Sequence, residues 1–212
     1  MEDKNPIDDL KEIRKIMEKS TKFISLSGLS GVFAGITALV GVWIAYDLIE
    51  TFSKKAPFYY AQGRMEEGWF ELDMKLFALA GIVLVLALSF GVLFTWLKAR
   101  KNNQKILTPM GFRLALSVGV PLFFGGVFCF GLWLQGVTFL IIPSMLIFYG
   151  MSLLNGSKYV HNEIKYLAGL EMILGTLALY RPEFGIYLWA TGFGVLHIIY
   201  GTIMYFKYDY KK

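Results

Sequence analysis

The sequence predicts an all-α membrane protein with six transmembrane helices and an N-terminal amphipathic helix outside the bilayer core. Of the 212 residues, 56% are hydrophobic and only 17% are charged, whereas soluble domains carry about 25% charged residues. Several apolar stretches reach the length of about 20 residues that a helix needs to cross a bilayer. The basic residues also gather in alternate connecting segments, as they do in multi-pass proteins. Apart from residues 50–73, no extramembrane stretch is long enough to fold alone, which excludes a separate soluble catalytic or nucleic-acid-binding domain.

Residues 1–22 are predicted to form an amphipathic helix at the cytoplasmic surface. Asn5 can cap this helix and Pro6 suits its first position, while its apolar residues share one stripe: Ile7, Leu10, Ile13 and Met17. Two interpretations stay open. The helix rests on lipid headgroups with its lysines near anionic lipid, or it packs on a partner or a second copy of the chain.

Six apolar segments follow and make a transmembrane domain over residues 23–206, before a cytoplasmic tail at 207–212. The turn between the third and fourth segments is only Gln135-Gly136, which predicts a tight antiparallel hairpin. Residues 50–73 are expected to form the one sizeable external loop, with aromatic side chains at headgroup depth. The six predicted spans cover residues 23–49, 74–97, 112–134, 137–154, 164–180 and 184–206.

The distribution of Lys and Arg predicts the orientation. With these spans, 16 of the 21 basic residues fall on the side that holds both termini. Cytoplasmic segments carry such an excess, so both termini are expected in the cytoplasm of a bacterial cell, with the chain in the inner (plasma) membrane. The expected partners are the lipid bilayer and a second copy or another membrane protein, and no nucleic acid.

Small residues mark the faces on which helices are expected to pack closely. Ser27, Gly31 and Gly35 recur at every fourth position, a pattern that lets two transmembrane helices approach each other. The same role is predicted for three further glycines: Gly175, Gly194 and Gly201. Tight packing within the bundle and dimerisation through this face both remain open.

Two ionisable residues, Glu171 and His197, lie well inside apolar spans. A charged side chain at the centre of a membrane helix costs about 2.5 kcal/mol or more, so such residues face the bundle interior or water. At about 1.5 Å per residue, the two lie at depths that differ by roughly 6 Å, so a direct ion pair and a pair bridged by a water or by Tyr200 both stay open. The pair forms either a structural polar lock or a proton- or ligand-binding site.

One tetrapeptide raises an enzymatic alternative. Gly28-Leu29-Ser30-Gly31 resembles the Gly-x-Ser-Gly sequence around the nucleophile of rhomboid intramembrane proteases, which have six spans and use a histidine on a late one. The resemblance implies Ser30 as nucleophile and His197 as base. The tetrapeptide lies on the first span rather than the fourth, and no asparagine-bearing oxyanion motif accompanies it. No phosphate loop, dinucleotide fingerprint or metal motif is present, and the one cysteine, Cys129, makes no cluster. No cofactor or metal is expected.

Three segments carry a family resemblance: Lys11-Glu12-Ile13-Arg14, the run 23–31 (FISLSGLSG) and the run 193–201 (FGVLHIIYG). They look like signatures of uncharacterised small polytopic integral membrane proteins of Bacteroidetes-type bacteria. The resemblance implies a bacterial inner-membrane location and supplies no activity.

The leading functional hypothesis is a non-enzymatic one. It is a small transport-type or accessory membrane protein with a polar intramembrane site near Glu171 and His197. The alternatives are a membrane scaffold or partner subunit, and an intramembrane serine hydrolase that uses Ser30 and His197.

Overall fold

In the computed structural model, which describes residues 27–103 and 108–210, every regular element is helical. The predicted helix over residues 1–22 lies outside the described residues. The all-helical class predicted from composition is confirmed. The long helices are α2 (Gly28–Ala61), α3 (Met65–Lys101), α4 (Pro109–Leu134), α5 (Ile141–Gly156) and α6 (Ile164–Tyr180).

Within the described residues, five helical segments are long and apolar enough to cross a membrane. They are α2, α3, α4, the segment Thr138–Gly156 that contains α5, and the final segment Pro182–Asp209. The fifth predicted span, α6, has 17 residues. At about 1.5 Å per residue it reaches roughly 26 Å, slightly less than the hydrocarbon core of about 30 Å. The count of six crossings therefore remains a prediction.

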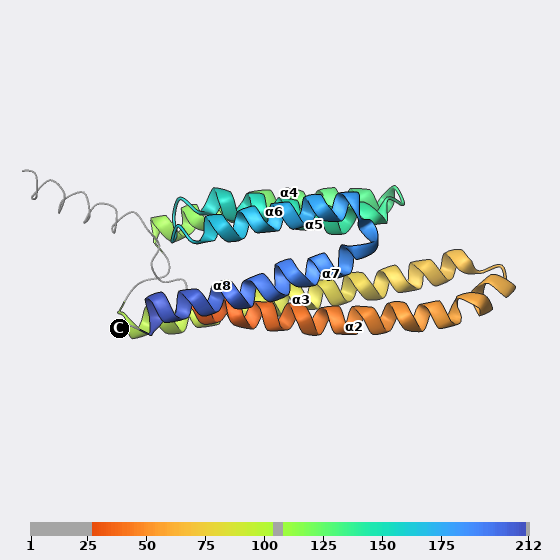
Figure 1. Cartoon of the computed structure of the whole chain (residues 1–212), viewed down its shortest axis with the longest axis horizontal. Helices are drawn as coiled ribbons and strands as arrows, with labels where there is room; N and C mark the ends of the chain where they lie inside the picture. The colour runs from red at the N-terminus through yellow and green to blue at the C-terminus, as the bar shows by residue number, and fades with distance from the viewer. Residues whose placement is uncertain (1–26, 104–107, 211–212) are drawn as a thin grey trace, which may run out of the picture.

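The helices form two layers (Figure 1). One layer holds α4, α5 and α6, and the other holds the α2–α3 hairpin with the last helical segment alongside α2. The chain passes from the first layer to the second after α6, through the short helix η2 (Pro182–Phe184) and α7 (Gly185–Trp189). Side chains of α5 and α6 that contact the last segment therefore lie where the two layers meet.

Local sequence signals set the ends of α4. Pro109 occupies its first turn and the Thr108 hydroxyl accepts a hydrogen bond of 3.0 Å from the Gly111 amide, which satisfies a donor that the helix leaves free. At the other end the chain turns at Gln135 and Gly136, where Gly136 has a φ of +71°. The tight hairpin expected between these spans is therefore present, followed by the short helix η1 (Thr138–Leu140).

The hairpin of α2 and α3 is longer than predicted. The expected loop over residues 50–73 is helical except for the turn at 62–64, where Gly63 has a φ of +67°. Aromatic packing across the hairpin stabilises these extra turns: the Phe52 and Trp69 rings lie 4.5 Å apart, and a Cβ on Gly68 would touch the Tyr59 ring. The loop prediction was wrong because charged residues ended the apolar windows without ending the helices.

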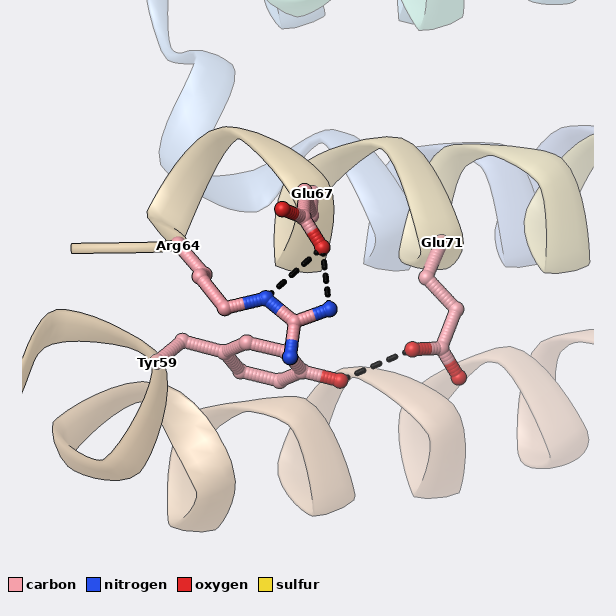
Figure 2. A network of polar contacts seen from close by, with 4 residues as sticks. All are labelled: Tyr59, Arg64, Glu67 and Glu71. Atoms are coloured by element: carbon pink, nitrogen blue, oxygen red, sulfur yellow. Dashed lines mark hydrogen bonds and ion pairs between the residues drawn. The ribbon is translucent and has the colours of Figure 1, made fainter. Parts of the chain in front are cut away.

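Polar contacts join the two helices near this turn (Figure 2). The Tyr59 hydroxyl on α2 donates a 2.8 Å hydrogen bond to Glu71 on α3, whose other carboxylate oxygen lies 2.6 Å from the Lys75 ammonium. Arg64, just before α3, donates from Nε to Glu67 over 2.8 Å. These charged side chains are exposed, so water screens their attraction and the pairs add little to stability.

The last apolar segment is interrupted rather than a single α-helix over residues 184–206. It runs from α7 through a π-helix, η3 (Ala190–Leu196), into α8 (His197–Met204) and a second π-helical turn, η4 (Tyr205–Asp209). A π-turn widens the helix by one residue, and such turns are frequent at functional sites. Here the wide turn immediately precedes His197.

The small-residue faces lie against each other within the chain. A Cβ on Gly31 would sit 3.1 Å from the Gly201 Cα, and one on Gly35 would sit 2.5 Å from the Gly194 carbonyl oxygen. Gly175 of α6 approaches the Ile147 backbone of α5 equally closely. The glycines therefore serve contacts between α2 and the last segment, and between α5 and α6, where only backbone fits.

A carboxylate near the C-terminus holds the start of α2. Asp209 Oδ2 accepts hydrogen bonds from the Ser27 hydroxyl (3.1 Å) and the Gly28 amide (2.9 Å). Its other oxygen lies 2.6 Å from the Lys98 ammonium, and both side chains of this ion pair are about 10% exposed. A negative charge at a helix N-terminus is favourable, so Asp209 fastens three helices at one end of the molecule.

Candidate functional site

Glu171 of α6 is the most unusual buried group that the structure describes. Its side chain has no exposed area, and within the described residues neither carboxylate oxygen has a hydrogen-bond partner. The nearest basic atom is His197 Nδ1, 3.5 Å from Oε1. An ionised carboxylate without donors is costly in an apolar interior, so this position needs a neutralising proton or a charged neighbour.

His197, the first residue of α8, is almost fully buried and is hydrogen-bonded at both ring nitrogens. Nδ1 lies 2.9 Å from the Gly192 carbonyl oxygen, and Nε2 lies 2.6 Å from the Tyr149 hydroxyl. A carbonyl only accepts, so Nδ1 carries the hydrogen. In the neutral ring Nε2 therefore accepts the Tyr149 proton. This network assigns the tautomer, with Nδ1–H directed to Gly192 instead of Glu171.

The π-helix η3 makes this arrangement. It places the Gly192 carbonyl within reach of a side chain five residues later, and it brings Gly192 so close to Glu171 that any side chain there would overlap Oε2. Tyr149 comes from α5, Glu171 from α6 and His197 from α8. The site thus joins the two layers of Figure 1 through three helices that are separate in sequence.

Tyr149, and not Tyr200, contacts the histidine. The Tyr200 hydroxyl is buried and has no hydrogen-bond partner in the part of the chain that the structure covers, and the same holds for Ser152. Both tyrosines pack against one hydrophobic cluster, which consists of Leu153, Val160, Ile164, Leu167 and Ala168. Tyr149 was not among the residues predicted for the site, although a tyrosine in the middle of an apolar span was the available signal.

Ser30 is not arranged as a nucleophile with His197 as its base. Its hydroxyl donates to the Ser27 carbonyl, one turn back on its own helix. Both nitrogens of His197 are engaged by Tyr149 and Gly192. Nucleophilic catalysis requires a hydrogen bond between the nucleophile and the base, and this geometry gives the hydrolase alternative no support.

The site formed by Glu171 and His197 can hold a proton. Glu171 and His197 offer two positions for it: a carboxylate oxygen, or Nε2 of the ring. A proton at Nε2 turns that nitrogen into a donor, so the hydrogen bond with Tyr149 must reverse. Among the described residues, no group of three or more His, Cys, Asp or Glu side chains is placed to hold a metal ion.

Comparison of the chain with protein-family models, with curated proteins and with solved structures finds no match in any of the three.

Proposed function

We propose that this chain is a small multi-pass protein of a bacterial inner membrane, of the transport type, in which Glu171 and His197 bind a proton within the membrane. The proposal includes six crossings, both termini in the cytoplasm, and kinship with the Bacteroidetes-type membrane proteins that the chain resembles. The observation that carries the functional part is the fully buried carboxylate of Glu171, which has no hydrogen-bond donor among the described residues and lies 3.5 Å from an imidazole nitrogen.

A purely structural role fits this geometry less well. A polar lock between helices stabilises a bundle when its groups satisfy each other, but the one hydrogen on Nδ1 goes to Gly192 and Glu171 receives none. Ionisable residues inside membrane helices typically face the bundle interior and mark proton relays or substrate pathways. Because neither oxygen of Glu171 has a donor among the described residues, the carboxylate can take up a proton without breaking a hydrogen bond.

Proton binding also has a structural consequence. When Nε2 is protonated, Tyr149 accepts from the ring and its own hydroxyl hydrogen needs a new acceptor, while the imidazolium charge lies beside Glu171. The three residues belong to α5, α8 and α6. A change of one proton therefore alters the contacts between the two layers, which is the kind of coupling that a transporter requires.

The scaffold alternative has less support. It rested on the N-terminal helix, which lies outside the described residues, and on the small-residue face of Ser27, Gly31 and Gly35, which packs on the last segment of the same chain. Because this face is covered by the chain itself, it gives no support for a partner protein.

Infrared difference spectroscopy on the protein in lipid vesicles tests the proton site. We expect a pH-dependent band of a protonated carboxylic acid that disappears in Glu171→Gln and shifts in His197→Ala and Tyr149→Phe. Proton flux into vesicles that contain a pH-sensitive dye is expected to fall in the same variants. The matched control is Glu183→Gln, which removes an exposed carboxylate paired with Arg181. If Glu171→Gln leaves the carboxyl band, the flux and the thermal stability unchanged, the proton site is refuted.

A further inference from the structure

A second feature of the molecule is an apolar pocket of about 270 Å³ where the two layers meet. Its walls come from α2, α3, the end of α4, the start of α5 and α7, and they include Ala45, Ala80, Trp133, Ile142 and Trp189. The residues of the proton site do not line it. Its chemistry is therefore a separate question.

The lining offers almost no polar group to a ligand. Apart from the indole nitrogens of its two tryptophans, its polar side chains are Asp73 and Thr138. Asp73 accepts a 2.9 Å hydrogen bond from Trp133 Nε1, and the Phe77 ring packs edge-on against the Trp133 ring at 5.2 Å. Water inside such a cavity would lack the two to four polar partners that it needs. The pocket suits an uncharged, apolar occupant.

The pocket is elongated along the helices. On α3 its lining extends from Asp73 to Val83, ten residues or about 15 Å at 1.5 Å per residue, and on α2 it extends from Ile49 to Gly41. Asp73 lies at the end of the pocket near the charged turns of the hairpin, where Glu71 and Lys75 form their ion pair. The shape is that of a narrow slot with one polar end.

We propose that this pocket binds one hydrocarbon chain of a bilayer lipid, with the lipid headgroup at the Asp73 end. The α2, α3 and α4 walls are helices apolar enough to cross a membrane, and α5 and α7 lie in segments that are, so lipid chains are the apolar molecules that surround the slot. Between helices in lipid, close packing and dispersion rather than water exclusion decide association. A slot with two tryptophan walls provides such contacts to a linear chain.

The Trp189 wall of the slot leads to the proton site through contacts between aromatic rings. The Trp189 ring lies 4.8 Å from Phe193, and Phe193 lies 4.8 Å from Tyr149. Leu146, which is fully buried and follows the slot residue Met145 on α5, lies against Gly192. A bound chain would therefore contact α5, which carries Tyr149 of the proton site, and α7, which leads into the π-helix before His197. The lipid proposal itself does not depend on the proton site.

Photocrosslinking in vesicles of phosphatidylethanolamine and phosphatidylglycerol tests the proposal. The probe is a small fraction of phosphatidylcholine with a diazirine in the middle of one acyl chain, and the adducts are located by peptide mass spectrometry. In the wild type we expect adducts concentrated on the segment Thr138–Met145 and on Ile186 or Trp189, which line the slot. Adducts spread evenly over the exposed faces of α3, without enrichment in the slot, would overturn the proposal.

A matched pair of variants on α3 separates the slot from the general lipid surface. Both alanines are exposed; Ala80→Trp places an indole in the slot, whereas Ala78→Trp adds the same side chain two residues away, outside the slot. We expect slot adducts to fall at least about tenfold, or about 1.4 kcal/mol, in Ala80→Trp and to stay unchanged in Ala78→Trp. Equal labelling in the two variants refutes the proposal. If Ala80→Trp does not fold, Ala45→Leu narrows the slot from α2 and is held to the same outcomes.

Discussion

Replacing Gly201 of α8 with alanine is expected to destabilise the protein by about 2 kcal/mol. The added Cβ would lie 2.5 Å from the Val32 nitrogen, 2.6 Å from the Gly28 oxygen and 2.9 Å from the Gly31 carbonyl carbon, whereas ordinary contact begins at 3.4 Å. All three atoms belong to the backbone of α2, so no side-chain rotation relieves the overlap. The two helices must separate by about 0.9 Å at this point.

The magnitude follows from two opposing effects. An alanine in a helix interior is favoured over glycine by about 1 kcal/mol. Forcing an extra carbon into a packed interface costs about 1–3 kcal/mol, and the separation also loosens the neighbouring contacts of Gly31 and Gly35 with the last segment. Since the overlap is with rigid backbone, we expect a cost at or above the upper end of that range and a net loss of stability.

The assay is unfolding in detergent micelles by increasing amounts of sodium dodecyl sulfate, followed by circular dichroism. The control is Gly126→Ala in α4, where a Cβ meets no atom within 4 Å and only the gain in helix propensity operates. We expect Gly126→Ala to be as stable as the wild type or slightly more so. A Gly201→Ala variant as stable as Gly126→Ala would show that α2 and α8 do not approach at these glycines.

Two further predictions concern the ends of the helices. Burial alone would raise the pKa of the Glu163 carboxyl, but hydrogen bonds from Lys207 and Tyr208 outweigh it and lower the pKa from 4.5 to about 2. The ionised carboxylate therefore stabilises the fold above pH 4.5, and this contribution is lost as the pH falls towards 2. Glu163→Gln should unfold about 1 kcal/mol more easily at pH 7 and match the wild type near pH 2 in the same unfolding assay; a constant difference at all pH values would contradict this. Asp209→Asn keeps an acceptor for the start of α2 but loses the ion pair with Lys98. We expect the free energy of unfolding to fall by about 2 kcal/mol. An unchanged stability would show that the ion pair does not contribute.

Several features followed from the sequence because each depends on a residue and its near neighbours. The helical class follows from the length of the apolar runs, and the turn between α4 and α5 follows from Gln135-Gly136. Glu171 and His197 were found because an ionisable residue inside an apolar run is conspicuous by itself. Their small neighbours, Gly175 and Gly201, likewise indicated that both helices pack closely at these depths.

Other features required the fold. The continuation of α2 and α3 through residues 50–73 depends on packing between Phe52 and Trp69, which lie on different helices. The contact of Tyr149 with His197 depends on how α5 and α8 meet across the two layers. No local pattern predicts either contact, because Phe52 and Trp69 are 17 positions apart in the sequence and Tyr149 and His197 are 48 positions apart.

The sequence by itself thus determined that the chain is a bundle of apolar helices with two ionisable residues inside it, since hydrophobic run length and residue type act locally. Only the tertiary structure decided which atoms those residues meet. The π-turn before His197 directs the Nδ1 hydrogen to Gly192, and no other group in the described part of the chain donates to the Glu171 carboxylate. Hydrogen bonds are short and directional, so this outcome depends on the relative placement of helices that are distant in the chain.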